Sequence, residues 1–186
     1  MLRDFRASKT AKILSWFKNP RNLVISLLVL VVAAGLWFFV FGSKREESKP
    51  TVKIDRSYTI VAKTKEGQRT DGRLKLTVLN AQIAPSILVQ GKVARPVKGK
   101  VFLVLNLEIE NSYKVPLYTL PVDLFRFIGG GGQKYPPSTS QGRVEIRPES
   151  TKKSNVAFVV TPGDKKFKIE VGDVNESKEL LEITFK

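Results

Sequence analysis

The chain has 186 residues, of which 42% are hydrophobic and 26% charged, and its formal net charge is +15. It contains neither cysteine nor histidine. These two absences exclude disulfides, zinc sites of the Cys/His type, thiolate nucleophiles and Ser-His-Asp triads. The acidic residues also lack the spacing of a calcium-binding loop. We therefore expect a protein that is not an enzyme, with no catalytic residue, no cofactor and no metal site.

A basic stretch and a long apolar run make up the first 42 residues. Residues 1–21 carry six Lys or Arg residues and one acidic residue. Leu23–Phe41 then contains nineteen residues without a charge, and a helix of that length crosses a hydrocarbon core of about 30 Å. We predict a basic cytoplasmic tail over residues 1–21 and a transmembrane helix over residues 22–42.

The basic tail indicates an N-terminus inside the cell, because Lys and Arg are enriched on the cytoplasmic side of membrane spans. Lys44 and Arg45 follow the span, so charge alone does not decide the orientation. The length of the C-terminal domain supports the same orientation, because a long domain crosses the membrane largely regardless of its charge. A signal peptide cleaved before Ser43 is the alternative, but the apolar run exceeds the usual signal core. We predict an uncleaved, single-pass anchor in the cell membrane, with the C-terminal domain outside the cytoplasm.

Residues 43–51 are polar and charged and include Pro50, which predicts a short linker. The remaining residues, 52–186, suffice for one domain. They contain nine runs of strand length separated by turn-forming residues. The runs are Tyr58–Ala62, Leu74–Ile83, Ile87–Val93, Val101–Glu110, Asp123–Ile128, Arg143–Ile146, Val156–Val160, Phe167–Val171 and Leu181–Phe185. Many short strands without a competing helical period predict an all-β, antiparallel sandwich or barrel.

Two of these runs predict strands at the centre of the core. In Val101–Glu110 the apolar residues come to alternate with polar ones, which places Leu105, Leu107 and Ile109 on one face and Asn106 on the other. Phe158 occupies the middle of a second apolar run. We therefore expect the Phe158 ring to be buried.

Four groups of residues follow one another in a characteristic order. They are Lys75–Val78; Gly99–Val104 with Glu110 and Asn111; Pro121–Phe127 with Gln133–Tyr135; and Arg147–Glu149 with Asn155–Val160. This order resembles the telokin-like, immunoglobulin-like domain of unknown function found behind membrane or lipoprotein anchors in bacterial and archaeal surface proteins. The chain departs from the lipoprotein members, because it has no anchor cysteine and Gly129–Gly132 replaces a polar turn. The resemblance implies an extracytoplasmic, non-catalytic, immunoglobulin-like β-sandwich, which we place at residues 52–186.

The candidate functional feature is a stretch without acidic residues from Gly72 to Leu107. Four of its basic residues lie within nine positions around Pro96, where a hairpin tip would cluster them: Lys92, Arg95, Lys98 and Lys100. Such a cluster attracts polyanions, and a solvated basic loop is the alternative. Phe102 is the only aromatic residue in the stretch. We therefore do not expect nucleic acid, whose single strands stack on aromatic side chains.

These features predict a membrane-anchored, extracytoplasmic β-sandwich that acts as a non-catalytic binding module for an envelope component. Its expected partners are the membrane and either another protein or an acidic envelope polymer. The alternative is a structural subunit of an envelope assembly, such as a secretion, pilus or division complex. A binding module should work without its span, whereas an assembly subunit should lose its partners. The sequence does not predict an oligomeric state.

Overall fold

The structure is a computed structural model that describes residues 49–186. These residues belong to one compact unit, Ser48–Lys186. The predicted tail and transmembrane helix, and the linker as far as residue 48, lie outside the described residues. Between residues 49 and 186, no helix has the length and apolar character needed to cross a membrane.

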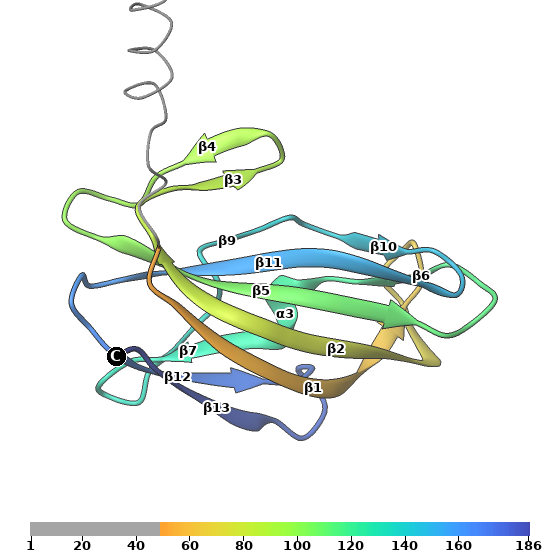
Figure 1. Ribbon diagram of the computed structural model, residues 1–186. Helices are drawn as coiled ribbons and strands as arrows, with labels where there is room; N and C mark the ends of the chain where they lie inside the picture. Colours follow the sequence, from red (N-terminus) through yellow and green to blue (C-terminus); the bar gives the residue numbers. More distant parts are fainter. Residues whose placement is uncertain (1–48) are drawn as a thin grey trace, which may run out of the picture. The chain divides into compact units, whose positions relative to one another are not determined.

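Two antiparallel sheets and one separate hairpin form the domain (Figure 1). The larger sheet has the strand order β10-β6-β1-β2-β5-β11-β9. Its strands are β1 (Thr51–Lys63), β2 (Arg69–Ala84), β5 (Val101–Asn111), β6 (Leu117–Thr119), β9 (Thr139–Ser140), β10 (Val144–Ile146) and β11 (Ser150–Val160). The smaller sheet has the order β13-β12-β7-β8. Its strands are β7 (Phe125–Ile128), β8 (Lys134–Tyr135), β12 (Lys166–Val171) and β13 (Glu179–Thr184). The hairpin consists of β3 (Ile87–Val89) and β4 (Lys92–Ala94), and one helical turn, α3 (Pro121–Leu124), precedes β7.

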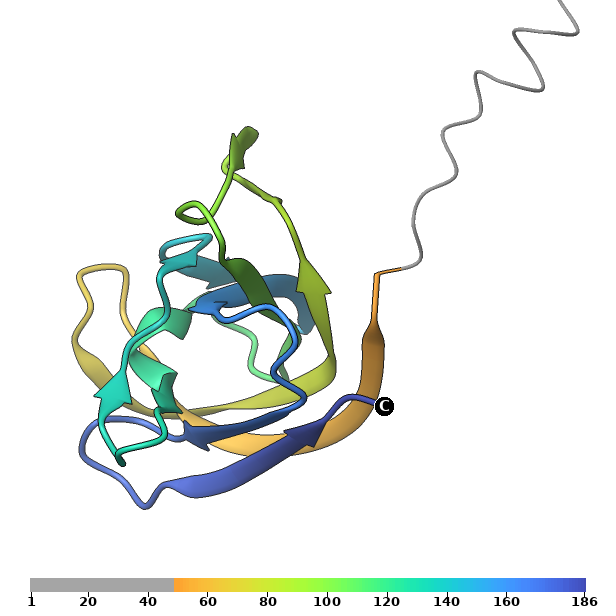
Figure 2. The same ribbon diagram turned by 90° about the vertical axis from the view of Figure 1, so that its left-hand side faces the viewer.

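The two sheets face each other across a single apolar core (Figure 2). Alternation along β5 turns Leu105, Leu107 and Ile109 into this core, as predicted. From the smaller sheet, Phe167 and Ile169 on β12 enter the same cluster. The predicted all-β, antiparallel β-sandwich is thereby confirmed.

Most predicted strands lie within observed strands or exceed them by one residue, as at Arg143 and Phe185, but two predictions differ more. Ile87–Val93 is not one strand, because β3 and β4 pair antiparallel around Gln90 and Gly91. Both turn residues have positive φ angles, 49° and 78°, as a two-residue hairpin turn of this type requires. Asn or Asp is the usual first residue of such a turn, so Gln90 did not indicate a hairpin turn in the sequence. In the predicted strand Asp123–Ile128, the first two residues belong to α3.

Asn111 links three segments at the end of β5. Its side chain is buried, with 1% exposed. Its Nδ2 donates hydrogen bonds to the backbone oxygens of Val115, Ile146 and Arg147, at 2.8, 3.2 and 3.0 Å. Its Oδ1 accepts one from the Tyr113 amide at 2.9 Å. The side chain therefore ties β5 to the loop before β6 and to the end of β10.

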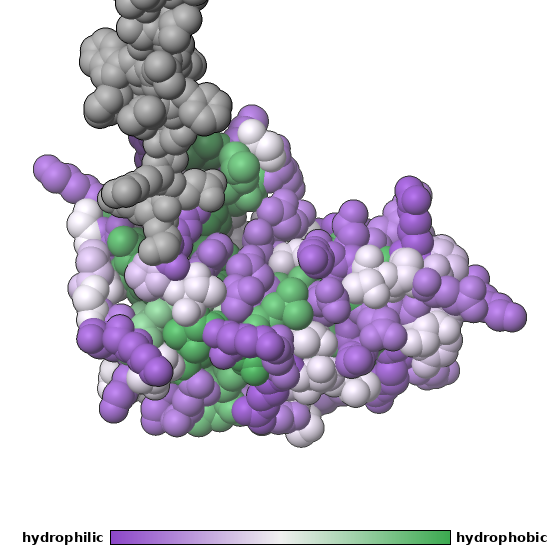
Figure 3. All heavy atoms as spheres, in the orientation of Figure 1, coloured by the Kyte–Doolittle hydropathy of each residue, from purple (hydrophilic) through white to green (hydrophobic). Residues whose placement is uncertain are grey.

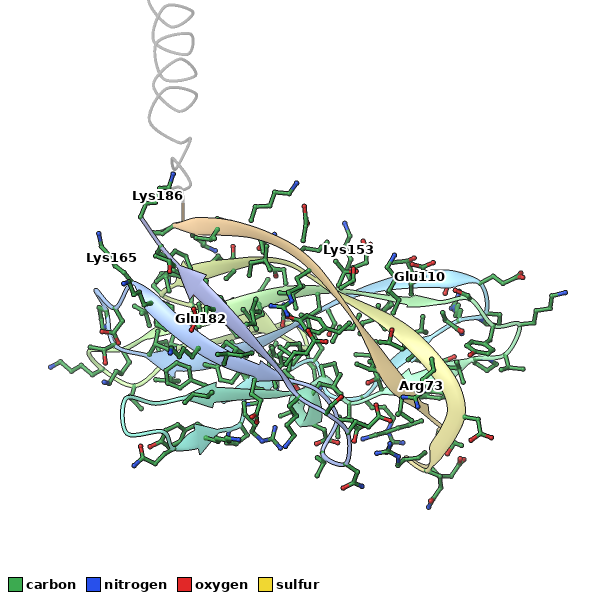
Figure 4. The ribbon with its side chains drawn as sticks, turned by 90° about the horizontal axis from the view of Figure 1, so that it is seen from below. Arg73, Glu110, Lys153, Lys165, Glu182 and Lys186 are labelled. Atoms are coloured by element: carbon green, nitrogen blue, oxygen red, sulfur yellow. The ribbon has the colours of Figure 1, made fainter. Side chains whose placement is uncertain are left out.

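Ion pairs connect the larger sheet to the loop between β12 and β13. The guanidinium of Arg69 contacts the buried carboxylate of Asp173 at 3.0 Å. Arg69 and Arg73 also contact Glu176, at 3.1 and 2.8 Å. Figure 4 labels Arg73 on β2 and shows this side of the domain from below.

We predict that Phe158→Ala lowers the free energy of unfolding by about 3 to 5 kcal/mol, because it leaves a cavity in the core. The ring of Phe158 is buried, and its centroid lies 6.0 Å from that of Phe127. Urea denaturation of the purified protein measures the effect. Tyr135→Ala is the matched control: Tyr135 is half exposed, so removal of its ring should cost less than about 1 kcal/mol. Equal costs for the two variants would contradict the assignment of the core face.

We predict that Asn111→Asp costs roughly 3 to 5 kcal/mol at neutral pH, because a buried carboxylate then faces three carbonyl oxygens. The folded protein should raise the pKa of the introduced carboxyl above its ordinary value of about 3.9. Below a pH of about 3.9 the carboxyl is neutral in both the folded and the unfolded state, so the stability is largely retained. The stability is then lost as the pH rises through the higher pKa of the folded state. Unfolding curves recorded from acidic to neutral pH test this, with the wild type as reference. A variant as stable as the wild type at neutral pH would show that the hydrogen bonds of Asn111 are dispensable.

Candidate functional site

The structure places the four predicted basic residues on β4 and on the loop that leads to β5. Lys92 lies on β4, whereas Arg95, Lys98 and Lys100 follow it. All four are exposed, and within residues 49–186 none of them forms an ion pair. The predicted hairpin tip around Pro96 is wrong, because the tip lies at Gln90 and Gly91.

A second tight turn shapes the loop between β4 and β5. The Lys100 amide donates to the Val97 oxygen at 3.1 Å, and Gly99 has a φ of 79°, which suits glycine. Lys100 Nζ also donates to Thr161 Oγ1 at 3.0 Å. The four basic residues thus share one exposed segment, with its last member tied to the end of β11.

Sequence reasoning missed a polar groove of about 640 Å³ on the outer face of the larger sheet. Its floor is a row of asparagines from three neighbouring strands: Asn80 on β2, Asn106 on β5 and Asn155 on β11. Strand pairing places Asn106 opposite both of the others. Asn106 Nδ2 donates to Asn80 Oδ1 at 2.7 Å. We call this the amide groove, defined by Asn80, Asn106, Gln141, Arg143, Lys153 and Asn155.

A β-bulge explains why Asn80 lies in this row. Val78 and Ala81 are both buried in the core. Two residues therefore lie between these consecutive inward-facing positions, whereas a regular strand would have one. The pairing of β2 with β5 shifts between Val78 and Asn80, which makes Leu79 the additional residue. The bulge turns Asn80 outward, where strict alternation after Val78 would have pointed it into the core.

Gln141 joins the groove to the β3–β4 hairpin. Its Nε2 donates to Asn155 Oδ1 at 3.4 Å and to the Leu88 oxygen at 3.3 Å. Its Oε1 accepts from the Gln90 amide at 3.4 Å. One amide side chain therefore contacts both the hairpin and the asparagine row.

The rim of the groove is mainly positive. Arg143, Lys152 and Lys153 line it, against the single acidic residue Glu145. Lys153 lies on the outer face together with Glu110, as the pairing of β11 with β5 requires, and both are labelled in Figure 4. The guanidinium of Arg143 donates to the Lys65 oxygen. Lys152 and Lys153 are exposed, and within residues 49–186 neither forms an ion pair.

The groove offers hydrogen-bond donors and acceptors together with positive charge. An amide side chain can donate and accept at once. Within residues 49–186, Asn106 Oδ1 and Asn155 Nδ2 make no hydrogen bond, so they are available to a ligand. This chemistry suits a ligand that carries hydroxyl or amide groups and no net positive charge.

Three groups outside the groove have shifted pKa values. Burial raises the pKa of the Tyr58 hydroxyl. A hydrogen bond from Thr64 lowers the pKa of Glu66. A hydrogen bond to Asp55 raises the pKa of Lys53.

No protein-family model matches the sequence, and no curated protein matches it. Solved structures do resemble the chain. A conserved hypothetical protein from Bacillus anthracis is 17% identical, with a TM-score of 0.44, over 73% of this chain and 99% of its own. An uncharacterized β-sandwich protein from Clostridium difficile is 18% identical, with a TM-score of 0.46, over 75% of this chain and 97% of its own. A functionally unknown protein from Listeria monocytogenes is 11% identical, with a TM-score of 0.38, over 74% of this chain and 88% of its own. Likenesses at this level carry no conclusion about function.

Proposed function

We propose that this chain is a single-pass membrane protein whose immunoglobulin-like β-sandwich acts outside the cytoplasm as a non-catalytic binding module. Its ligand is another component of the cell envelope, and the amide groove is its binding site. The membrane anchor is Leu23–Phe41, supported by the length of this uncharged run and by the basic tail before it.

The immunoglobulin likeness is supported by two antiparallel sheets that enclose one core. It is also supported by the resemblance of residues 73–171 to telokin-like domains. The larger sheet has seven strands, more than either sheet of a constant-type immunoglobulin domain. The enlargement comes partly from short strands such as β9 and β10, and Val144 and Glu145 of β10 line the amide groove.

The single observation that carries the proposal is the asparagine row on the floor of the amide groove. A solvated outer face of a sheet needs no such row, because scattered charged residues suffice for solubility. Here, three amides from three strands stand side by side, with Asn106 bonded to Asn80 at 2.7 Å. Such a fixed arrangement of donors and acceptors is typical of a binding site that orients a polar ligand.

We predict that filling the groove abolishes binding to envelope material. Asn155→Trp places a large side chain on the groove floor while the Asn106–Asn80 hydrogen bond remains. The measurement is retention of the purified protein on isolated cell-wall polymer and on immobilised envelope proteins from the same cells. Retention of the variant should fall at least about tenfold, which corresponds to the loss of about 1.4 kcal/mol of binding free energy.

Lys166→Trp is the matched control, because Lys166 is exposed on the smaller sheet, away from the groove. It should bind like the wild type. Circular dichroism verifies that both variants are folded. Equal retention of the groove variant and the control would contradict the assignment of the groove as the binding site.

A further inference from the structure

The β3–β4 hairpin exposes an apolar pair that no part of residues 49–186 covers. Leu88 and Val93 lie opposite each other in the hairpin, so their side chains point to the same face. They are 62% and 61% exposed. Ile87 points the other way and packs on the small cluster formed by Ala84, Phe102, Val104 and Ala157. The hairpin therefore has one face packed on the sheet, and its second apolar face is largely exposed at the edge of a hollow that Val104 and Asn155 also line.

The segment that follows adds a third apolar side chain and positive charge. Val97 is 69% exposed. Around it lie the four basic residues already described, all exposed. We call residues 87–100, comprising the hairpin and the loop to β5, the docking segment. Figure 2 shows the hairpin projecting from the body of the domain, and Figure 3 shows hydrophobic surface at the hairpin.

Exposed apolar residues among cations are typical of a surface that binds a lipid bilayer. The apolar side chains enter the boundary between headgroups and acyl chains, and Lys and Arg contact anionic headgroups. A protein partner is less well matched, because the buried centre of protein interfaces is depleted in Lys. A merely solvated loop does not account for the three exposed apolar residues, Leu88, Val93 and Val97, which lie among the four cations in residues 87–100.

The position of the docking segment in the chain also favours the membrane. Lys49 lines the same hollow as Leu88 and Val93, so the chain enters the domain beside the hairpin. Nine residues separate Phe41, the end of the predicted span, from Thr51, the start of β1. Nine extended residues reach at most about 30 Å. The anchor would therefore hold the docking segment within reach of the bilayer.

We propose that the docking segment binds the surface of an anionic lipid bilayer, with its apolar side chains in the headgroup region and its cations on the lipid phosphates. This inference rests on the membrane anchor proposed above. Docking would orient the domain on the membrane. Gln141 contacts both the hairpin and the amide groove, so the groove would lie next to the docked segment.

The experiment uses a fluorescent probe in the full chain, which contains no cysteine of its own. Val93→Cys is labelled with a polarity-sensitive fluorophore. Val115→Cys is the matched control, because Val115 is 55% exposed and follows the opposite end of β5. Each protein is reconstituted into vesicles of phosphatidylcholine with or without phosphatidylglycerol. A carbonate wash then tests the anchor, and the emission maximum and iodide quenching test docking.

In vesicles with phosphatidylglycerol, we expect the probe at position 93 to shift to the blue and its iodide quenching to fall several-fold. The control probe should remain accessible to iodide. Replacing the four cations of the docking segment by Gln, or raising the salt concentration, should reverse the shift. The chain should remain in the vesicles after the wash in every case.

Several outcomes would overturn the inference. A chain that stays in the vesicles while its probe at position 93 remains in water contradicts docking and leaves the anchor intact. A chain removed by carbonate contradicts the anchor, and with it the inference. Equal protection with and without phosphatidylglycerol excludes anionic lipid as the ligand. Protection that appears without vesicles, as protein concentration rises, identifies a second copy of the chain as the partner instead.

Discussion

The larger sheet has to bury its inner face, which packs mainly against the smaller sheet and also against Leu124 of α3. Side chains from both sheets meet in a single core, with Leu105 and Leu107 on one side and Phe167 and Ile169 on the other. Burial at about 25 cal/mol per Å² of apolar surface is the dominant stabilising term. The core therefore fixes the register of β2, β5 and β11. Because register determines which side chains point outward, the same constraint aligns the three asparagines of the amide groove.

The outer face of the larger sheet is divided into two parts with different chemistry. At one end the β3–β4 hairpin covers a small apolar cluster around Phe102 and Val104. Beyond the hairpin the face becomes polar and carries the amide groove. Gln141 contacts both parts. The segment proposed to bind lipid and the groove proposed to bind an envelope component are therefore neighbours, and a domain held at a membrane could use both at once.

The sequence predicted the strands and the core better than the candidate site. Alternation in β5 was sufficient to identify its buried face, and the basic residues from Lys92 to Lys100 were visible as a cluster. The hairpin turn was missed, because Gln90 is not a typical residue for the left-handed conformation that it adopts. The asparagine row was missed for a different reason. Residues 80, 106 and 155 meet only through strand pairing, and the bulge at Leu79 reverses the face on which Asn80 lies. Neither pairing nor a bulge can be inferred from the spacing of apolar residues alone.

In the proposal made above, an uncleaved N-terminal span displays this domain on the outer side of the cell membrane. Protease treatment of intact spheroplasts, with antibodies against each end of the chain, tests it most directly. We expect the C-terminal domain to be digested and a small membrane-bound fragment containing the N-terminus to survive. A domain fully protected until the membrane is permeabilised would contradict the orientation, and a mature chain that begins at Ser43 would contradict the anchor.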